Sequence, residues 1–263
     1  ILRVSPSTVS RVAKGLDEAV AAFRKRKLKD VYKVIMLDGV ALNRKTGAGA
    51  VSKPVLTAMG ITHDKRKEVI DFRLASSESE AEWEGFLTGL QERGLTLDST
   101  EIICVDGGKG LLSALKTVCP NAPVQRCWAH KIRNIVDKVK KKDAEAVKKG
   151  LRKIYQAQNV VKAKKAAGEF ARTWKTAYPA AVKCLRDDLD ELLTFFRFKD
   201  ADWRKAARTT NAIERRFREV RKRTRPMGVF SDKTSIERIL YAVFTYENKK
   251  QGTVATFLMT QNN

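Results

Sequence analysis

The chain has 263 residues, of which 53 are Lys or Arg and 30 are Asp or Glu, so its formal net charge is +23. A hydrophobic content of 43% is typical of a folded chain and excludes a disordered basic tail. No apolar run reaches the roughly 18 residues that a membrane span requires, and the start lacks a signal-peptide pattern. Because the chain begins with Ile1 instead of Met, we expect the natural N-terminus to lie upstream.

The excess of positive charge predicts a polyanionic partner, and nucleic acid is the first candidate. A ribosomal or merely solvated basic protein is the alternative. Basic residues concentrate in segments 1–30, 131–153 and 204–225, whereas segment 76–101 is acidic. Four cysteines without the spacing of a disulfide framework indicate a reducing compartment.

The first residues carry a helix start signal. Ser5 is a typical N-cap, and Pro6 suits the first helical position. Small polar residues at such a start fit the second helix of a helix-turn-helix, which enters a DNA groove; an ordinary capped helix is the alternative. The candidate groove contacts are Ser7, Thr8 and Arg11.

Strand and helix patterns alternate after residue 30. The expected strands are 32–38, 53–61, 67–74, 101–106 and 123–127, with a turn-rich connection at 43–49. Ser77 and Glu80 form a capping box at the start of a helix, and another helix follows Asp106. The order β-β-β-α-β-α-β, followed by helices alone, predicts a mixed α/β fold with a five-stranded sheet flanked by helices.

Asp38 and Asp106 each end a predicted strand and each precede a glycine. If a right-handed crossover sets the two strands side by side and parallel, both carboxylates leave the same end of the sheet, where open α/β sheets build their sites. This is the arrangement of the ribonuclease-H-like fold. Two carboxylates this close favour a divalent cation such as Mg²⁺, and a pair of such ions suits phosphodiester chemistry. The alternative is that both Asp-Gly pairs are only turns.

A third carboxylate, Glu214, lies beside the apolar stripe of a predicted helix that Asn211 opens. An inward-leaning Glu214 would complete a metal site; alternatively, it pairs with Arg218 on a surface helix. The arginines around it carry the planar guanidinium that matches phosphate groups. They are Arg215, Arg216, Arg218, Arg221 and Arg223.

Four motifs occur in a recognisable order: Leu37-Asp-Gly39, Val105-Asp-Gly-Gly-Lys-Gly-Leu111, Arg126-Cys-Trp-Ala-His-Lys-Ile-Arg-Asn134 and Thr210-Asn-Ala-Ile-Glu-Arg-Arg-Phe-Arg218. Over about residues 1–250 the chain resembles the Mutator-type transposases of bacterial insertion sequences, which are DDE enzymes with a ribonuclease-H-like core. The resemblance implies that Asp38, Asp106 and Glu214 are a catalytic triad that binds two Mg²⁺ or Mn²⁺ ions. It implies a polynucleotidyl transferase that binds terminal inverted repeats, cleaves DNA and joins the freed 3′-hydroxyl to target DNA.

The same resemblance implies a domain organisation. We expect a truncated helix-turn-helix remnant and basic linker at 1–30, the core in two parts at 31–130 and 206–263, and an α-helical insertion domain at 131–205. The expected partners are the element's DNA ends and target DNA, bridged by a homodimer in the bacterial cytoplasm at the nucleoid, with no membrane and no small-molecule substrate. The alternatives are a ribonuclease-H-like nuclease or resolvase that only hydrolyses, and a DNA-binding regulator without catalysis.

A Cys/Asp-x-x-His pair is a further marker of the family, here Cys127 and His130. Zinc would need four ligands, and only His63 and dispersed cysteines remain. We therefore expect both side chains to brace the wall of the active site, together with Asn211. Trp128 either stacks on an unpaired base or packs in the core. Further candidate DNA contacts are Lys109, Arg126, Lys131 and Arg133.

Overall fold

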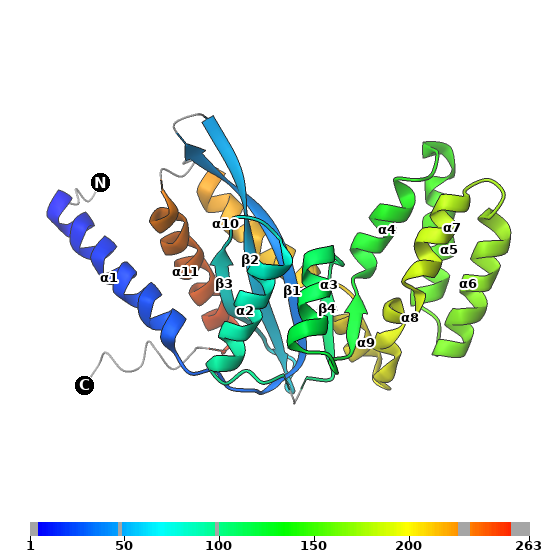
Figure 1. The fold of residues 1–263 in the computed structure, drawn as a ribbon, viewed down its shortest axis with the longest axis horizontal. Helices are drawn as coiled ribbons and strands as arrows, with labels where there is room; N and C mark the ends of the chain where they lie inside the picture. The colour runs from blue at the N-terminus through cyan, green and yellow to red at the C-terminus, as the bar shows by residue number, and fades with distance from the viewer. Residues whose placement is uncertain (1–4, 47–48, 98–99, 226–231, 254–263) are drawn as a thin grey trace. The chain divides into compact units, whose positions relative to one another are not determined.

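The computed structural model describes residues 5–46, 49–97, 100–225 and 232–253 (Figure 1). Two compact units make up the chain: the first comprises 1–100, 109–120 and 212–263, and the second comprises 101–108 and 121–211. The predicted order β-β-β-α-β-α-β is confirmed, and within the described residues only helices follow the last strand. The α/β class is therefore confirmed, whereas the ribonuclease-H-like topology, the helix-turn-helix remnant and the domain boundaries stay predictions.

Three antiparallel strands form the sheet of the first unit: β1 (Tyr32–Thr46), β2 (Gly49–Thr62) and β3 (Lys67–Leu74). The prediction that β1 ends at Asp38 is wrong, because Asp38 pairs with Thr57 and the strand continues to Thr46. The alternative that Asp38 and Gly39 form a turn is wrong for the same reason. The side chains of Val40 and Leu42 lie on the same face of the strand as Asp38 and are also buried. The alternation of the strand therefore continues beyond Gly39. Of the turn-rich connection expected at 43–49, residues 43–46 and 49 belong to strands, and 47–48 lie outside the described residues.

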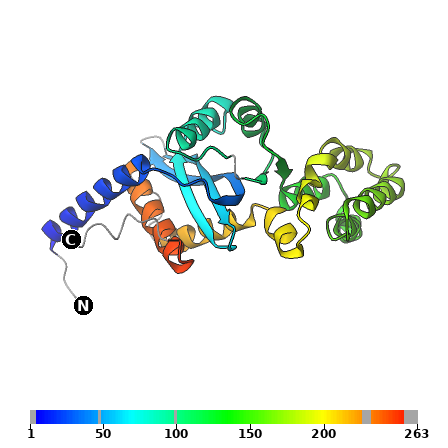
Figure 2. The ribbon, with the colours of Figure 1, turned by 90° about the horizontal axis from the view of Figure 1, so that it is seen from below.

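Consecutive side chains of β3 face opposite sides of this sheet, as the pleat requires. The Phe72 ring lies 5.5 Å from that of Phe244 on α11 (Lys233–Lys250). The guanidinium of the next residue, Arg73, lies 5.5 Å from the ring centroid of Phe86 on α2 (Glu80–Glu92). Thus α11 covers one face of the sheet and α2 the other, as Figures 1 and 2 also show.

Three more described helices belong to the first unit. α10 (Asn211–Thr224) lies on the α11 side, where the rings of Phe217 and Phe244 are 5.4 Å apart. α1 (Pro6–Lys25) contacts the same side through Phe23, whose ring lies 5.5 Å from that of Tyr241. α3 (Lys109–Val118) packs against α2 on the other side.

The helix starts in this unit follow their cap residues. Ser5 is the N-cap of α1 as predicted, and its hydroxyl accepts from the backbone nitrogen of Thr8 at 3.2 Å. The cap of α2 is Ser79, not Ser77: its side chain accepts from the backbone nitrogen of Glu82. Ser79 and Glu82 have the same Ser-x-x-Glu spacing, so the sequence offered two overlapping start signals.

The second unit combines a parallel strand pair with helices. β4 (Ile102–Val105) pairs with β5 (Val124–Arg126) in parallel. The helices that follow β5 in this unit are α4 (Trp128–Val136), η1 (Lys141–Asp143), α5 (Ala144–Tyr155), α6 (Val160–Trp174), α7 (Pro179–Asp187), α8 (Leu189–Leu192), η2 (Thr194–Arg197) and α9 (Ala201–Ala207). Within the described segments, no helix is both long and apolar enough to cross a membrane.

Candidate active site

Asp38 lies in the interior of β1 and is 3% exposed. It is in register with Thr57, which is in register with Phe72. Residues in register across an antiparallel sheet share a face. Asp38 therefore points to the face that carries Phe72, which is the side covered by α10 and α11.

Glu214 lies in the first turn of α10 and is partly buried. Its neighbours Ile213 and Phe217 are fully buried, so the predicted apolar stripe of this helix is confirmed. The first unit thus places Asp38 and the helix that carries Glu214 on the same face of its sheet. Sequence reasoning had expected a carboxylate at the end of a strand, but the structure provides one in mid-strand.

Asp106 follows the last residue of β4 directly, as predicted, and lies in the second unit. Its Oδ1 accepts from the backbone nitrogen of Gly108 at 2.9 Å. Gly107 between them has φ +97, and a Cβ at this position would lie 2.0 Å from the Arg126 guanidinium. Only glycine therefore fits at position 107, and local packing is a sufficient reason for its presence.

Within the described residues, Asp38, Asp106 and Glu214 do not form one group of metal ligands. Asp106 belongs to the second unit, whereas Asp38 and Glu214 belong to the first. Across the described segments, no three His, Cys, Asp or Glu side chains are grouped to hold a metal ion, so zinc at Cys127 and His130 gains no support either. In kind, however, three carboxylates are the donors that Mg²⁺ prefers.

A fourth carboxylate, Glu78, lies close to β1 and was not a candidate at the sequence level. Its carboxyl carbon would be 2.6 Å from a Cβ at Gly39. Since Gly39 is next to Asp38 in the strand, that Cβ position points to the opposite face of the sheet. The only sequence signal for Glu78 was its place in the acidic segment 76–101.

The arginines of α10 divide into two kinds. Arg216 forms an ion pair with Glu247 of α11, with Nη1 and Oε2 2.8 Å apart, and is largely buried. Arg215, Arg218 and Arg221 are exposed and form no ion pair within the described residues. Arg223 is also exposed, but it pairs with Glu219 on the same helix.

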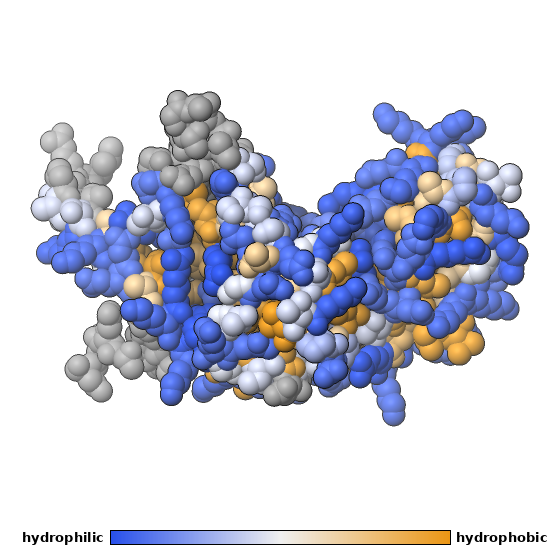
Figure 3. All heavy atoms as spheres, viewed as in Figure 1, coloured by the Kyte–Doolittle hydropathy of each residue, from blue (hydrophilic) through white to orange (hydrophobic). Residues whose placement is uncertain are grey.

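Two arginines of α10 form a positive cluster with Lys67 of β3. Burial lowers the pKa of Lys67, and the nearby Arg215 and Arg216 lower it further. Three cations this close repel one another, and an anion would relieve the repulsion. The surface drawn in Figure 3 is largely hydrophilic, in keeping with such a polar partner.

Cys127 and His130 interact with each other, whereas their role in bracing the wall of the active site stays a prediction. The Cys127 Sγ accepts from the backbone nitrogen of Thr210 at 3.3 Å and from its hydroxyl at 3.5 Å. Burial raises the pKa of the Cys127 thiol, but hydrogen bonds and charge from His130 and the Thr210 N–H outweigh burial, so the pKa is lowered overall. Thr210 itself was missed as a candidate, although it stands next to Asn211 at the start of α10.

Two predicted DNA contacts are interior residues. Arg126 and Lys131 are 9% and 5% exposed. Both pair with Asp188, which lies 3.3 Å from the Nη1 of Arg126. Their charges are therefore neutralised inside the second unit, and neither fits the role of a phosphate contact.

Trp128 is also an interior residue. It is 1% exposed, and its Nε1 donates to the carbonyl of Leu192 at 2.8 Å. Its ring lies 5.3 Å from that of Tyr155. The structure thus supports the core alternative for Trp128 and not base stacking.

The remaining candidate DNA contacts lie at the surface. Ser7 and Arg11 are exposed on α1, and Thr8 is partly buried within the cap, where its hydroxyl is 2.9 Å from that of Ser5. Lys109 is exposed at the start of α3, and Arg133 is exposed on α4. These positions are compatible with DNA contact and do not test it.

Comparison with known proteins places this chain among transposases. A transposase for insertion sequence element IS905 from Lactococcus lactis subsp. lactis (strain IL1403) is 34% identical over 249 residues, 94% of this chain and 62% of that protein. A transposase for element ISRM5 from Rhizobium meliloti (strain 1021) is 31% identical over 246 residues, 93% of this chain and 61% of that protein. A transposase for element IST2 from Acidithiobacillus ferrooxidans is 38% identical over 171 residues, 65% of this chain and 57% of that protein.

The chain spans about three fifths of the length of the first two relatives. Residues 2–251 match the family described as "Transposase, Mutator family", which includes all three acidic residues and the Cys127–His130 pair. The chain therefore belongs to the Mutator family of transposases.

Proposed function

We propose that this chain carries the catalytic part of a DNA transposase that acts at the terminal inverted repeats of an insertion sequence. One observation supports this above the others: Asp38, Asp106 and Glu214 all lie within the family match over residues 2–251. The reaction we propose is hydrolysis of one phosphodiester, followed by attack of the released 3′-hydroxyl on a phosphodiester of target DNA.

The proposed roles of the acidic residues follow from their chemistry. Asp38, Asp106 and Glu214 would hold two divalent ions, Mg²⁺ or Mn²⁺. Such ions, when bound, supply positive charge to the attacking and leaving oxygens of a phosphodiester. Asp38, fixed in mid-strand, has little freedom to move away from its position, and Glu214 is held beside a buried stripe of α10.

The basic residues of α10 would bind the DNA backbone. Arg215, Arg218 and Arg221 are exposed on the helix that carries Glu214, and no ion pair within the described residues competes for them. A guanidinium donates two parallel hydrogen bonds to a phosphate, so it both attracts and orients the strand. We infer that the partner is duplex DNA of the element ends and the target, bridged by two copies of the protein.

The test is strand transfer with pre-cleaved element ends, in the full chain with Mg²⁺ or Mn²⁺. Asp38→Asn, Asp106→Asn and Glu214→Gln are each expected to lower turnover at least about a hundredfold, because a lost carboxylate weakens metal charge stabilisation. The matched control is Glu219→Gln on the same helix, where the carboxylate pairs, among the described residues, only with Lys222 and Arg223.

The outcomes separate the competing functions. Wild-type turnover in the Asp38 or Glu214 variant would refute the catalytic assignment. Release of 3′-hydroxyl ends without joining would indicate a nuclease or resolvase, and DNA binding without metal-dependent cleavage would indicate a regulator. Sizing the protein on end DNA tests the proposed homodimer.

A further inference from the structure

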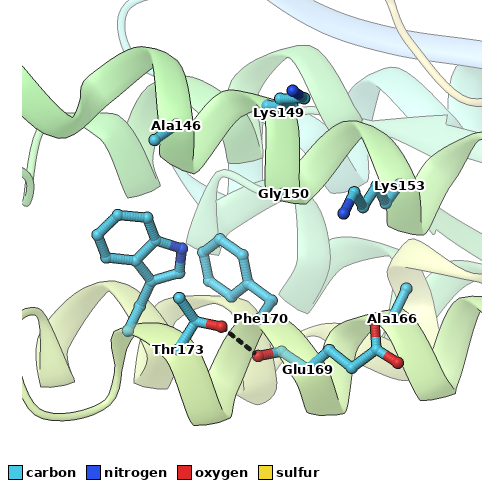
Figure 4. Close-up of a pocket in the computed structure, with 9 residues that line it drawn as sticks. Ala146, Lys149, Gly150, Lys153, Ala166, Glu169, Phe170 and Thr173 are labelled. Carbon is cyan, nitrogen blue, oxygen red and sulfur yellow. Dashed lines mark hydrogen bonds between the residues drawn. The ribbon is translucent and has the colours of Figure 1, made fainter.

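The second unit contains a recess between α5 and α6, with a volume of about 340 Å³ (Figure 4). Sites for small ligands have roughly 300–1,000 Å³, so the recess could hold a group the size of a nucleotide base with its sugar. The Phe170 ring lies between the two helices, and Lys149 and Lys153 line the α5 side. Trp174 also lines the recess.

Trp174 is the most accessible of the four tryptophans. Trp83, Trp128 and Trp203 are 1%, 1% and 7% exposed, whereas Trp174 is only partly buried. Phe170 beside it is 4% exposed and rests on Gly150, where a Cβ would come within 2.9 Å of its ring. A phenyl group fixed by close packing and an accessible indole therefore offer an apolar platform.

The charges around this platform are not used within the protein. Lys149 and Lys153 are one helical turn apart on α5, both exposed, and Glu169 of α6 is exposed as well. None of the three forms an ion pair within the described residues. Lysines without partners next to an aromatic platform are the combination by which proteins bind single-stranded nucleic acid: cations for the phosphates and a ring for the base.

We propose that this recess binds one unpaired nucleotide of the DNA on which the transposase acts. The base stacks on Trp174, and the adjoining phosphates lie against Lys149 and Lys153. The carboxylate of Glu169 repels a phosphate and so directs the base toward α6 and the phosphates toward α5. This inference rests on the proposed function, because it assumes that DNA is the partner.

The experiment uses the full chain and two DNA duplexes of equal length, one fully paired and one with a single unpaired 2-aminopurine nucleotide. The wild type is expected to bind the second duplex about tenfold more tightly, the order of one base–aromatic stacking contact. Binding should quench the 2-aminopurine fluorescence and the Trp174 emission together. Trp174→Ala should abolish this preference, and Trp174→Phe, which keeps a ring, should retain most of it.

Lysine variants test the phosphate contacts. Lys153→Gln should weaken binding of the unpaired nucleotide and reduce its dependence on salt. The matched control is Lys165→Gln, because Lys165 is exposed on α6 but does not line the recess. This control removes the same charge and should leave the preference for the unpaired nucleotide unchanged.

The inference fails if the Trp174→Ala protein, folded by circular dichroism, keeps the wild-type preference, or if Lys165→Gln weakens binding as much as Lys153→Gln. Its failure differs from failure of the proposed function. A wild-type protein that joins DNA ends but ignores the unpaired nucleotide refutes only this site. A protein that binds neither duplex refutes the DNA partner itself.

Discussion

The Sγ of Cys127 accepts a hydrogen bond from the backbone nitrogen of Thr210, 3.3 Å away, across 83 positions of sequence. Beside it, the backbone nitrogen of Trp128 donates to the carbonyl of Arg208 at 3.0 Å. These contacts fix the segment that leads into α10, whose first turn carries Glu214. Cys127 thus acts on the start of the helix through Thr210.

Replacing Cys127 should therefore affect both stability and strand transfer. In Cys127→Ala the N–H of Thr210, which is fully buried, loses its acceptor, and a buried donor without a partner costs about 1–3 kcal/mol. Cys127→Asp supplies a carboxylate acceptor beside His130 and should recover part of the loss. Thermal unfolding and strand transfer measure the effect, with Cys119→Ala as the control at a partly exposed thiol. An aspartate variant that folds but is no better than alanine would argue against the acceptor role.

The same thiol makes stability depend on pH. The pKa of the Cys127 thiol is lower in the folded state than its ordinary value of 9.0. The stabilisation that the thiol gives to the folded state is therefore complete above pH 9.0, and it is lost as the pH falls through the pKa of the folded state. The difference in unfolding free energy between wild type and Cys127→Ser should therefore grow as the pH rises toward 9.0. Urea titrations at a series of pH values measure it.

Cys119 provides the opposite sign for comparison. Burial raises the pKa of this thiol to about 11, so the folded state favours the protonated form. The contribution of the Cys119 thiol to folding stability is present below pH 9.0 and is lost as the pH rises from there toward 11. A wild-type minus Cys119→Ser difference that grew with pH in this range would contradict the assignment.

The sequence predicted those features that depend on local periodicity. The bounds of β3 and the buried stripe of α10 follow from the alternation or the helical spacing of apolar residues. The order of strands and helices followed for the same reason. Asp38 was misplaced because Asp-Gly is a local turn signal, whereas the continuation of β1 depends on pairing with β2.

Local sequence patterns could not predict which basic side chains are buried in ion pairs and which are exposed. Arg126 and Lys131 stand in a basic motif, but their partner Asp188 lies 62 and 57 positions away. Arg216 pairs with Glu247, 31 positions away, whereas its neighbour Arg215 has no such partner within the described residues. Only tertiary structure separates a buried ion pair from an exposed phosphate contact.

Adjacent arginines on α10 should therefore respond differently to the same substitution. Arg216→Met removes the buried partner of Glu247 and leaves it only the exposed Lys250, 3.6 Å away, among the described residues, and breaking a buried pair costs up to about 3 kcal/mol. Arg215→Met should leave stability almost unchanged and weaken DNA binding, with a smaller salt dependence from the lost phosphate contact. Unfolding and binding measured on both proteins test this. Equal losses of stability would refute the distinction.

We expect Asp188 to be important for the stability of the second unit, because it pairs with the buried Arg126 and Lys131. In Asp188→Asn the charges of Arg126 and Lys131 remain buried, although Glu191 still lies 3.5 Å from Arg126. The expected loss is about 3 kcal/mol, and a second change, Lys131→Met, should restore part of it by removing one buried cation. Asp187→Asn is the matched control, because this neighbour forms an exposed pair with Lys183 and no other ion pair in the part of the chain that the structure describes. Similar unfolding curves for the two single variants would contradict the assigned role.

Three glycines should differ sharply in their tolerance of a methyl group. At Gly110 a Cβ would lie 2.3 Å from the backbone oxygen of Glu78 and 2.8 Å from the backbone nitrogen of Glu80, so Gly110→Ala forces α3 away from the start of α2 and should cost about 1–3 kcal/mol. At Gly39 the obstacle is the Glu78 carboxylate, the mobile end of a side chain, so Gly39→Ala should cost less, and Glu78→Ala in the same protein should remove that cost.

Gly168, within α6, has open space around its Cβ position. Gly168→Ala should stabilise the protein by up to about 1 kcal/mol, because alanine favours a helix more than glycine does. Thermal unfolding of the three single variants should therefore rank Gly168→Ala above wild type, Gly39→Ala slightly below and Gly110→Ala lowest. A Gly110→Ala protein as stable as Gly39→Ala would mean that α3 and the segment at Glu78 are not in close contact.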